Sequence, residues 1–167
     1  DIQLPQLGAM IEVPAALYQI RELARATDFL SVGTNDLTQY LLAVDRNNAR
    51  VAGLYSHFHP AILQALAYIA NDAHTEGKTV SVCGEMAGDP CSAVLLMAMG
   101  YDALSMNANN LPKVKSVIRH LRMADAKKLL SEVLSMHDAR AISQHANGTL
   151  AQWGVSKRLL HNETEEA

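Results

Sequence analysis

Residues that could do chemistry follow short apolar runs at three points of this chain. Glu12 falls within the run AMIEV, Asp36 comes three residues after FLSVG, and Cys83 closes the run TVSVC. If these runs are strands of a parallel α/β protein, their carboxyl ends lie at one edge, where carboxylate, amide and backbone N–H groups can converge on a ligand. The pattern therefore places the chemistry of the chain at that edge.

The stretch 29–46 (FLSVGTNDLTQYLLAVDR) carries the densest group of such residues. Its apolar start predicts a strand, Gly33 predicts a turn, and the apolar spacing over 37–44 predicts a helix. Asn35 and Asp36 come between the two elements. They are suited to binding a ligand, but Asn-Asp before a helix is also ordinary capping chemistry, so both interpretations remain open on the residues alone.

Glu12 and Cys83 also have two interpretations each. A carboxylate inside an apolar strand costs free energy unless it is paired, bound to a cation or placed at an exposed edge. A cysteine in an apolar run is most often inert packing. Here Gly84 and Glu85 follow Cys83 and predict a polar, flexible loop, which favours a functional role for the thiol.

The connection over residues 47–59 is long for a plain turn, and this length favours a functional loop at the ligand-binding end. It contains His57 and His59, two residues apart. That spacing suits a metal site, and it also suits two exposed loop histidines.

Four strand-then-helix units position these residues. The predicted strands are 9–13, 29–33, 79–83 and 103–106, and the predicted helices are 15–26, 37–44, 60–76, 90–99 and 112–122. Right-handed connections make such strands parallel. Four units in about 115 residues are half of a closed barrel, so we predict an α/β fold, the C-terminal half of a (β/α)8 TIM-type barrel followed by C-terminal helices. An open doubly wound sheet is the alternative.

We expect the half-barrel to span residues 1–122, trailing helices to span 123–147, and a weakly ordered tail to span 148–167. Helices are predicted over 125–136 and 139–146, with Asp125 and Asp138 as N-caps. Their apolar faces must cover either the outside of the barrel or another subunit. The last six residues include three Glu and are expected to be disordered.

Composition limits the function classes. The 167 residues are 49% hydrophobic with a net charge of -3, which predicts one buried core and excludes nucleic acid as a partner. The longest apolar run, 93–99, is too short to cross a membrane, and no leader opens the chain, so we expect a cytoplasmic protein without a membrane partner. Cys83 and Cys91 are expected to be reduced. The abrupt start at Asp1 leads us to expect a fragment.

Five segments together resemble a known family: GAMIEVP, SVGTNDLTQYLLAVDR, HTEGK, VCGEMAGD and MGYDALSM. They are similar to the phosphoenolpyruvate (PEP)-binding domain of enzyme I of the bacterial phosphotransferase system, with most likeness to its nitrogen-related branch. The resemblance to pyruvate, phosphate dikinase and PEP synthase is more distant. The match runs in unbroken order from Gly8 to about Arg122.

This resemblance implies that Glu12 and Asp36 bind Mg²⁺, which holds the carboxylate and enol oxygens of PEP. It implies contact of the phosphoryl group with Asn35 and Arg46, and a substrate near the backbone of the preceding turn. The substrate-contacting residues are then Gly33, Thr34, Asn35 and Arg46. Both Mg²⁺, which prefers few carboxylates plus substrate oxygens, and the planar Arg fork suit these tasks.

By the same resemblance, Cys83 protonates the enolate carbon, while Gly84 and Glu85 shape its surroundings. The implied activity is that of a PEP–protein phosphotransferase. It moves the phosphoryl group to a His of an N-terminal domain and on to a His-containing carrier protein, releasing pyruvate. That His and two phosphate-gripping Arg residues have no match here, so we expect the chain alone to be inactive.

Other functions stay open beside this one. Family members dimerise through this domain, so the chain could act chiefly as a dimerisation or regulatory module, and a homodimer is expected in either case. A relative of PEP synthase or pyruvate, phosphate dikinase, or another metal-dependent barrel enzyme acting on pyruvate or an oxoacid, would also carry such strand-end carboxylates.

Overall fold

A computed structural model describes residues 3–156 and 160 of the chain. Its strands form one parallel four-stranded sheet in the order β1-β2-β3-β4, so each strand pairs with the next along the sequence. The strands are β1 Gly8–Ile11, β2 Phe29–Gly33, β3 Thr79–Cys83 and β4 Ala103–Ser105. The α/β class with a parallel sheet is thereby confirmed. The order has no reversal, the feature that a doubly wound sheet requires.

Helices follow every strand. The α-helices are α1 Ile20–Ala26, α2 Thr34–Leu42, α3 Pro60–Thr75, α4 Glu85–Gly88, α5 Pro90–Met99, α6 Leu111–His120, α7 Met123–Leu134 and α8 Ala139–Gln152, with short 3₁₀ segments at η1 Pro14–Gln19 and η2 Ala52–Leu54. None of the helices in the described part of the chain combines the length and apolar composition needed to cross a bilayer.

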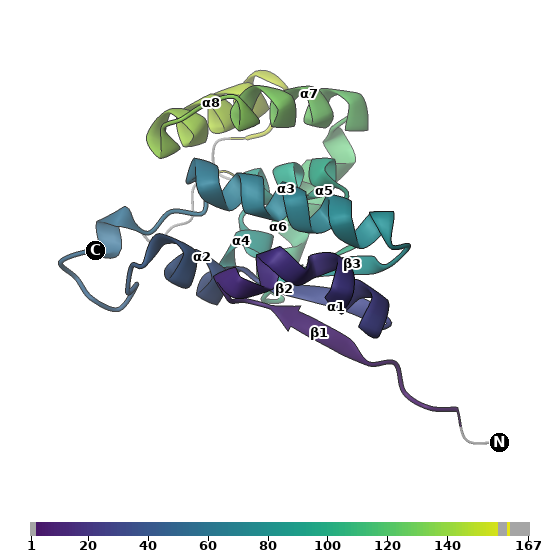
Figure 1. Cartoon of the computed structure of the whole chain (residues 1–167). Helices are drawn as coiled ribbons and strands as arrows, with labels where there is room; N and C mark the ends of the chain where they lie inside the picture. The colour runs from purple at the N-terminus through teal and green to yellow at the C-terminus, as the bar shows by residue number, and fades with distance from the viewer. Residues whose placement is uncertain (1–2, 157–159, 161–167) are drawn as a thin grey trace.

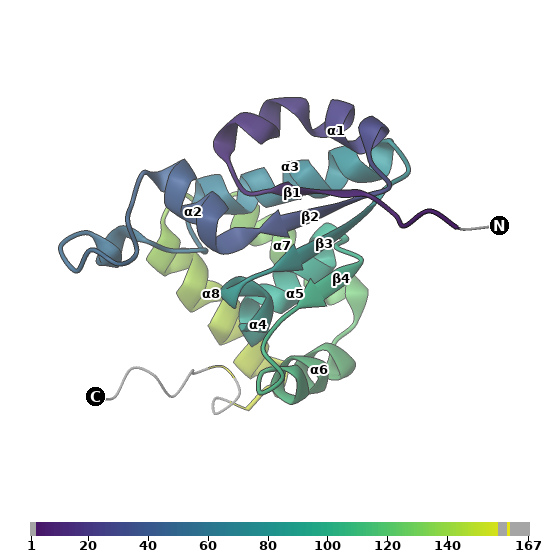
Figure 2. The same cartoon turned by 90° about the horizontal axis from the view of Figure 1, so that it is seen from below.

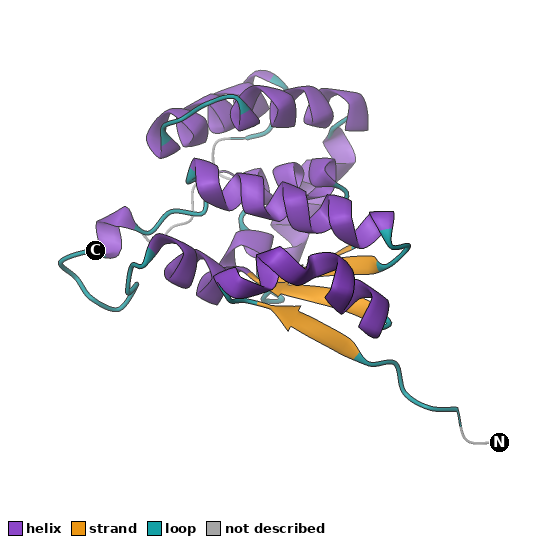
Figure 3. Cartoon of the chain, in the orientation of Figure 1, coloured by secondary structure: helices purple, strands orange, loops and turns teal. Residues whose placement is uncertain are grey.

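Five of the helices, α1, α3, α5, α7 and α8, form two layers on the same side of the sheet (Figures 1 and 3). The first layer contains α1, α3 and α5, which contact one another in series, and α7 and α8 lie on the outside of α5. α5 is apolar on nearly all sides, as in its run AVLLMAM, and a helix of that kind must be buried on all sides. The trailing helices therefore cover the first helical layer of their own chain, one of the two expected surfaces.

The sheet face opposite these helices is covered only in part, as the view from below shows (Figure 2). Leu30, Val32, Val80 and Val82 point into the helical layer and are fully buried or nearly so. Residues alternating with them, including Ser31, Ser81 and Cys83, are half-buried, and Met10 on β1 is 50% exposed. Because parallel sheets are normally covered on both faces, this face needs a further covering layer.

Some predicted boundaries were wrong. α2 begins at Thr34, so the polar residues predicted as a turn form the first helical turn; Gly33 is the N-cap and no side chain caps the helix. α7 begins at Met123, and its N-cap is Arg122 rather than the predicted Asp125. In contrast, Asp138 caps α8 as predicted, its Oδ1 accepting from the Ala141 N–H at 2.7 Å.

α8 also continues past its predicted end at residue 146 and reaches Gln152. The extension buries Leu150, which joins the core, while Gly148 lies in open space and costs the helix little tertiary contact. Residues 148–152 of the predicted weakly ordered tail are therefore helical. The predicted disorder of the last six residues concerns positions outside those that the structure describes.

Candidate functional site

The carboxyl ends of β2 and β3 are joined by side chains as well as by the strand ladder. Gly33 and Cys83 are register partners. Beyond them, the Thr34 hydroxyl donates to the Cys83 carbonyl at 2.9 Å, and the Glu85 N–H donates to Asn35 Oδ1 at 3.1 Å. Five of the residues predicted for the site are thus held together at one corner, where α2 and α4 begin.

Glu12 joins this corner from β1. It follows the last strand residue, and its Oε2 lies only 3.0 Å from where a Cβ on Gly33 would stand. Gly33 itself has φ -85°, which any residue adopts. A side chain there would therefore press on Glu12, which would have to shift by a few tenths of an ångström.

Gly84 is constrained both by its backbone conformation and by the space around it. Its φ is +117°, in the region that favours glycine, and a Cβ would stand 2.5 Å from Thr34 Oγ1 and 2.9 Å from Asn35 Oδ1. The turn after β3 can thus approach the first turn of α2 only because Gly84 lacks a side chain.

The carboxylates predicted as metal ligands are available for a cation. Asp36 lies half-buried in the first turn of α2, and neither it nor Glu12 takes part in an ion pair among residues 3–156. The described residues contain no group of three or more His, Cys, Asp or Glu side chains that could hold a metal ion, so they do not form a complete metal site by themselves. Two carboxylates that are completed by substrate oxygens suit Mg²⁺, so the donor set fits this ion.

The two loop histidines have other tasks. His59 Nδ1 accepts from the Ala61 N–H at 3.2 Å and so caps α3. His57 packs edge-on against Tyr55, with ring centroids 6.3 Å apart, and burial lowers the pKa of its imidazole. Since no metal cluster is found in the described part of the chain, nothing favours the metal interpretation of the pair.

The two thiols differ in environment. Cys83 is half-buried and its Sγ donates to the Val32 carbonyl at 3.4 Å. Cys91 is completely buried in α5, and burial raises the pKa of its thiol well above the usual range. Cys91 therefore serves as inert packing in the core, whereas Cys83 is the thiol that a substrate or reagent can reach.

Arg46 lies outside the corner, exposed at the start of the long loop, with its N–H donating to Gln39 Oε1 at 3.4 Å. Tyr55 brings the far end of that loop back, because its hydroxyl donates to the Asn35 carbonyl at 3.3 Å. Sequence reasoning did not assign Tyr55 to the site. The length of the loop was the only signal for it.

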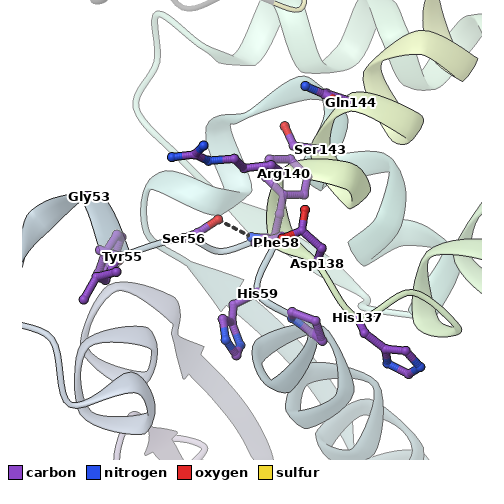
Figure 4. Close-up of a pocket in the computed structure, with 13 residues that line it drawn as sticks. Gly53, Tyr55, Ser56, Phe58, His59, His137, Asp138, Arg140, Ser143 and Gln144 are labelled. Atoms are coloured by element: carbon purple, nitrogen blue, oxygen red, sulfur yellow. Dashed lines mark hydrogen bonds between the residues drawn. The ribbon is translucent and has the colours of Figure 1, made fainter.

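A cavity of about 860 Å³ lies on the other side of this loop (Figure 4). It is lined by loop residues 53–56 and 58–60 and by the N-terminal part of α8, including Arg140 and Ser143. It contains none of the predicted site residues. The chemistry of the side chains therefore selects the strand ends as the candidate site.

Comparison with known proteins identifies relatives of this chain. A family model described as the PEP-binding domain of PEP-utilising enzymes matches residues 2–123. The chain is 44% identical over 154 residues to a "phosphoenolpyruvate-dependent phosphotransferase system" protein of Salmonella typhimurium, covering 92% of this chain and 21% of that protein. It is 43% identical over 155 residues to a protein of the same name in Escherichia coli, covering 93% and 21%.

A third relative is the phosphoenolpyruvate-protein phosphotransferase of Haemophilus influenzae, which is 43% identical over 139 residues and covers 83% of this chain and 24% of its own length. The chain thus spans between 21% and 24% of the length of these curated relatives.

Proposed function

Since the chain belongs to the PEP-utilising enzymes through their PEP-binding domain, we propose that it is the PEP-binding part of a phosphoenolpyruvate–protein phosphotransferase. In this proposal the four strands are the C-terminal half of a (β/α)8 barrel. The sequential strand order and the partly covered sheet face support it. The half-barrel is proposed to span residues 1–122, the trailing helices to span 123–147, and a C-terminal tail to span 148–167. The nitrogen-related branch stays a prediction.

In the proposed site, Glu12 and Asp36 hold Mg²⁺, which neutralises negative charge on the bound PEP. Asn35 and Arg46 bind the phosphoryl group, and the backbone of Gly33 and Thr34 lies near the substrate. Because Asn35 Oδ1 accepts from the Glu85 N–H, the NH₂ group of the Asn35 amide is the part free to donate to a phosphoryl oxygen.

The proposed chemistry has two steps. In the first, a His nitrogen elsewhere in the protein attacks phosphorus, the bond from phosphorus to the enol oxygen breaks, and its electron pair stays on that oxygen as an enolate. In the second, the methylene carbon takes the proton of the Cys83 thiol, giving pyruvate and a thiolate. Glu85 lines this corner. The half-buried position of Cys83 supports its role as the donor.

The partners proposed for the full-length enzyme follow from the reaction. They are PEP and pyruvate, a His-containing phosphocarrier protein that receives the phosphoryl group, and a second copy in a homodimer. The acceptor His would lie in a part of the protein beyond this chain. The chain alone is therefore proposed to bind PEP without completing a turnover.

One observation carries this proposal: the Thr34–Cys83 and Asn35–Glu85 hydrogen bonds, which bring the proposed proton donor and phosphoryl-binding amide to one corner. The test uses the full-length enzyme in D₂O with Mg²⁺. Cys83→Ala should abolish exchange of the pyruvate methyl protons, followed by NMR, while Mg²⁺ affinity persists, and Cys91→Ala should leave exchange intact. Unchanged exchange in Cys83→Ala would reject this role and favour another metal-dependent oxoacid enzyme.

A further inference from the structure

The Tyr55 hydroxyl lies at the first turn of α2, on one of the proposed phosphoryl-binding residues. It donates to the carbonyl of Asn35 at 3.3 Å. Burial chiefly raises the pKa of Tyr55, the Arg46 charge lowers it, and the Glu85 charge raises it. The hydrogen bond therefore joins the far end of the loop over 47–59 to a residue of the candidate site.

A buried polar group on α2 points to the same position. Thr38 is 1% exposed, and its Oγ1 has no hydrogen-bond partner among the described residues. It lies three residues after Asn35, about one helical turn from the carbonyl that the Tyr55 hydroxyl contacts. A buried hydroxyl without a partner is costly. Among the described residues, α2 therefore carries an unsatisfied polar group within about one turn of the Tyr55 contact.

Arg46 needs such support. It is exposed at the start of the loop over 47–59, and a long flexible side chain loses conformational entropy when it binds a ligand. The loop begins near Arg46, whose N–H donates to Gln39 on α2, and it returns to the first turn of α2 at Tyr55. Fixing Tyr55 on Asn35 therefore limits the space that the loop and Arg46 can explore.

We propose that Tyr55 is a positioning residue that anchors the loop over 47–59 on the first turn of α2 and thereby limits the positions that Arg46 takes when it and Asn35 bind the phosphoryl group. It acts through these two residues and not on the substrate itself. The proposal rests on the proposed function for its substrate, but the anchoring contact is independent of it.

The kinetic test is Tyr55→Phe in the full-length enzyme, because Phe keeps the ring against His57 and removes only the hydroxyl. Losing one hydrogen bond of this kind should raise KM for PEP about tenfold with a smaller change in kcat. Tyr40→Phe, at an exposed position of α2, is the matched control and should keep the wild-type KM. A wild-type KM in Tyr55→Phe overturns the proposal.

A double-variant cycle tests whether Tyr55 acts through Arg46. If it does, Tyr55→Phe should add little to the loss caused by Arg46→Lys. Fully multiplicative losses would overturn this coupling.

Amide hydrogen exchange provides a readout that does not need turnover. Peptides covering residues 46–55 should exchange faster in Tyr55→Phe than in Tyr40→Phe or the wild type. If the wild-type enzyme fails to transfer phosphate from PEP, the proposed function is rejected, and exchange still decides the anchor. Unchanged exchange rejects the anchor alone.

Discussion

At Gly33 and Gly84, the absence of a side chain determines where neighbouring site groups can lie. Gly84 combines φ +117° with a hypothetical Cβ 2.5 Å from Thr34 Oγ1. Gly84→Ala is therefore expected to destabilise the protein by about 1–3 kcal/mol, through strain and displacement of the α2 turn. Urea unfolding measures this change in the free energy of unfolding. Gly148→Ala is the control: in open space within α8, it should stabilise by about 0.5–1 kcal/mol. Equal effects would contradict this reasoning.

The two thiols should differ in reactivity. Cys83 is half-buried at the sheet edge, whereas Cys91 is completely buried and its thiol has a raised pKa. Since the thiolate is the reactive form, a maleimide at neutral pH should label Cys83 in the folded protein and reach Cys91 only after unfolding. Peptide mapping by mass spectrometry reads this out, with Cys83→Ser as the control. Labelling of Cys91 first would contradict the packing of α5.

The strand-end rule predicted which polar residues lie together at the corner, because polar residues after apolar runs must meet at one edge of a parallel sheet. It grouped Glu12, Asn35 and Cys83 correctly in space. It could not predict Tyr55, whose position depends on how the thirteen-residue loop over 47–59 folds back, and no spacing in the sequence encodes that return. It also read Gly33 as a turn residue, whereas the structure gives it a steric role.

At the scale of elements, α5 is the helix whose packing the rest depends on. Leu96 is completely buried between the sheet and the outer helices. Leu96→Ala should cost about 2–5 kcal/mol, because it removes apolar contacts and leaves a cavity that the surrounding layers fill only in part. Leu111→Ala on α6, where the side chain is 53% exposed, should change stability by no more than about 0.5 kcal/mol. Denaturant unfolding of both variants compares them.

Charged pairs join α1 to α3. Arg21 Nη2 lies 3.0 Å from Asp72 Oδ1, and this hydrogen bond is the main reason why the pKa of Asp72 is lowered. A lowered folded-state pKa means that the unfolded chain binds more protons, so the stabilisation is present above the unfolded-state pKa, near 3.9, and is lost as pH falls through the lower folded value. Thermal midpoints from pH 6 to pH 2 should therefore fall less in Asp72→Asn than in the wild type. Parallel curves would contradict this linkage.

Boundaries of elements were less predictable than their existence. Thr34 to Asp36 looked like a turn because their side chains suit caps and turns. Their backbone is instead helical, with Gly33 at the N-cap position, and the Thr34 hydroxyl donates to the Cys83 carbonyl of the neighbouring strand. The end of α8 was missed because its last turn is held by Leu150 in the core, a tertiary contact that local composition does not reveal.

At the scale of the whole molecule, sequence periodicity predicted the parallel sheet, because four apolar runs alternate with helical segments. It left open what the trailing helices cover. The answer depends on α5, whose apolar residues on every side require a second helical layer. Closure of a barrel remains part of the proposal.

The partly covered face of the sheet and its edges predict that copies of this chain associate. Within the described residues, β1 and β4 each have one strand neighbour, and Leu4, Leu7 and Met10 near β1 are 84%, 68% and 50% exposed. Unpaired edges and apolar surface favour pairing between chains. The 167-residue polypeptide should therefore sediment as a dimer or larger species at micromolar concentration. Met10→Lys should weaken this, and Met123→Lys on α7 should not. A stable wild-type monomer would contradict the prediction.

The hydrogen bonds from Thr34 to Cys83 and from Glu85 to Asn35 are intramolecular, so they exist before any substrate arrives. A ligand therefore binds to a corner whose hydrogen bonds are already formed. The loop over 47–59 is the part that adjusts when the ligand binds, so the motion of this loop should set the rates of ligand binding and release.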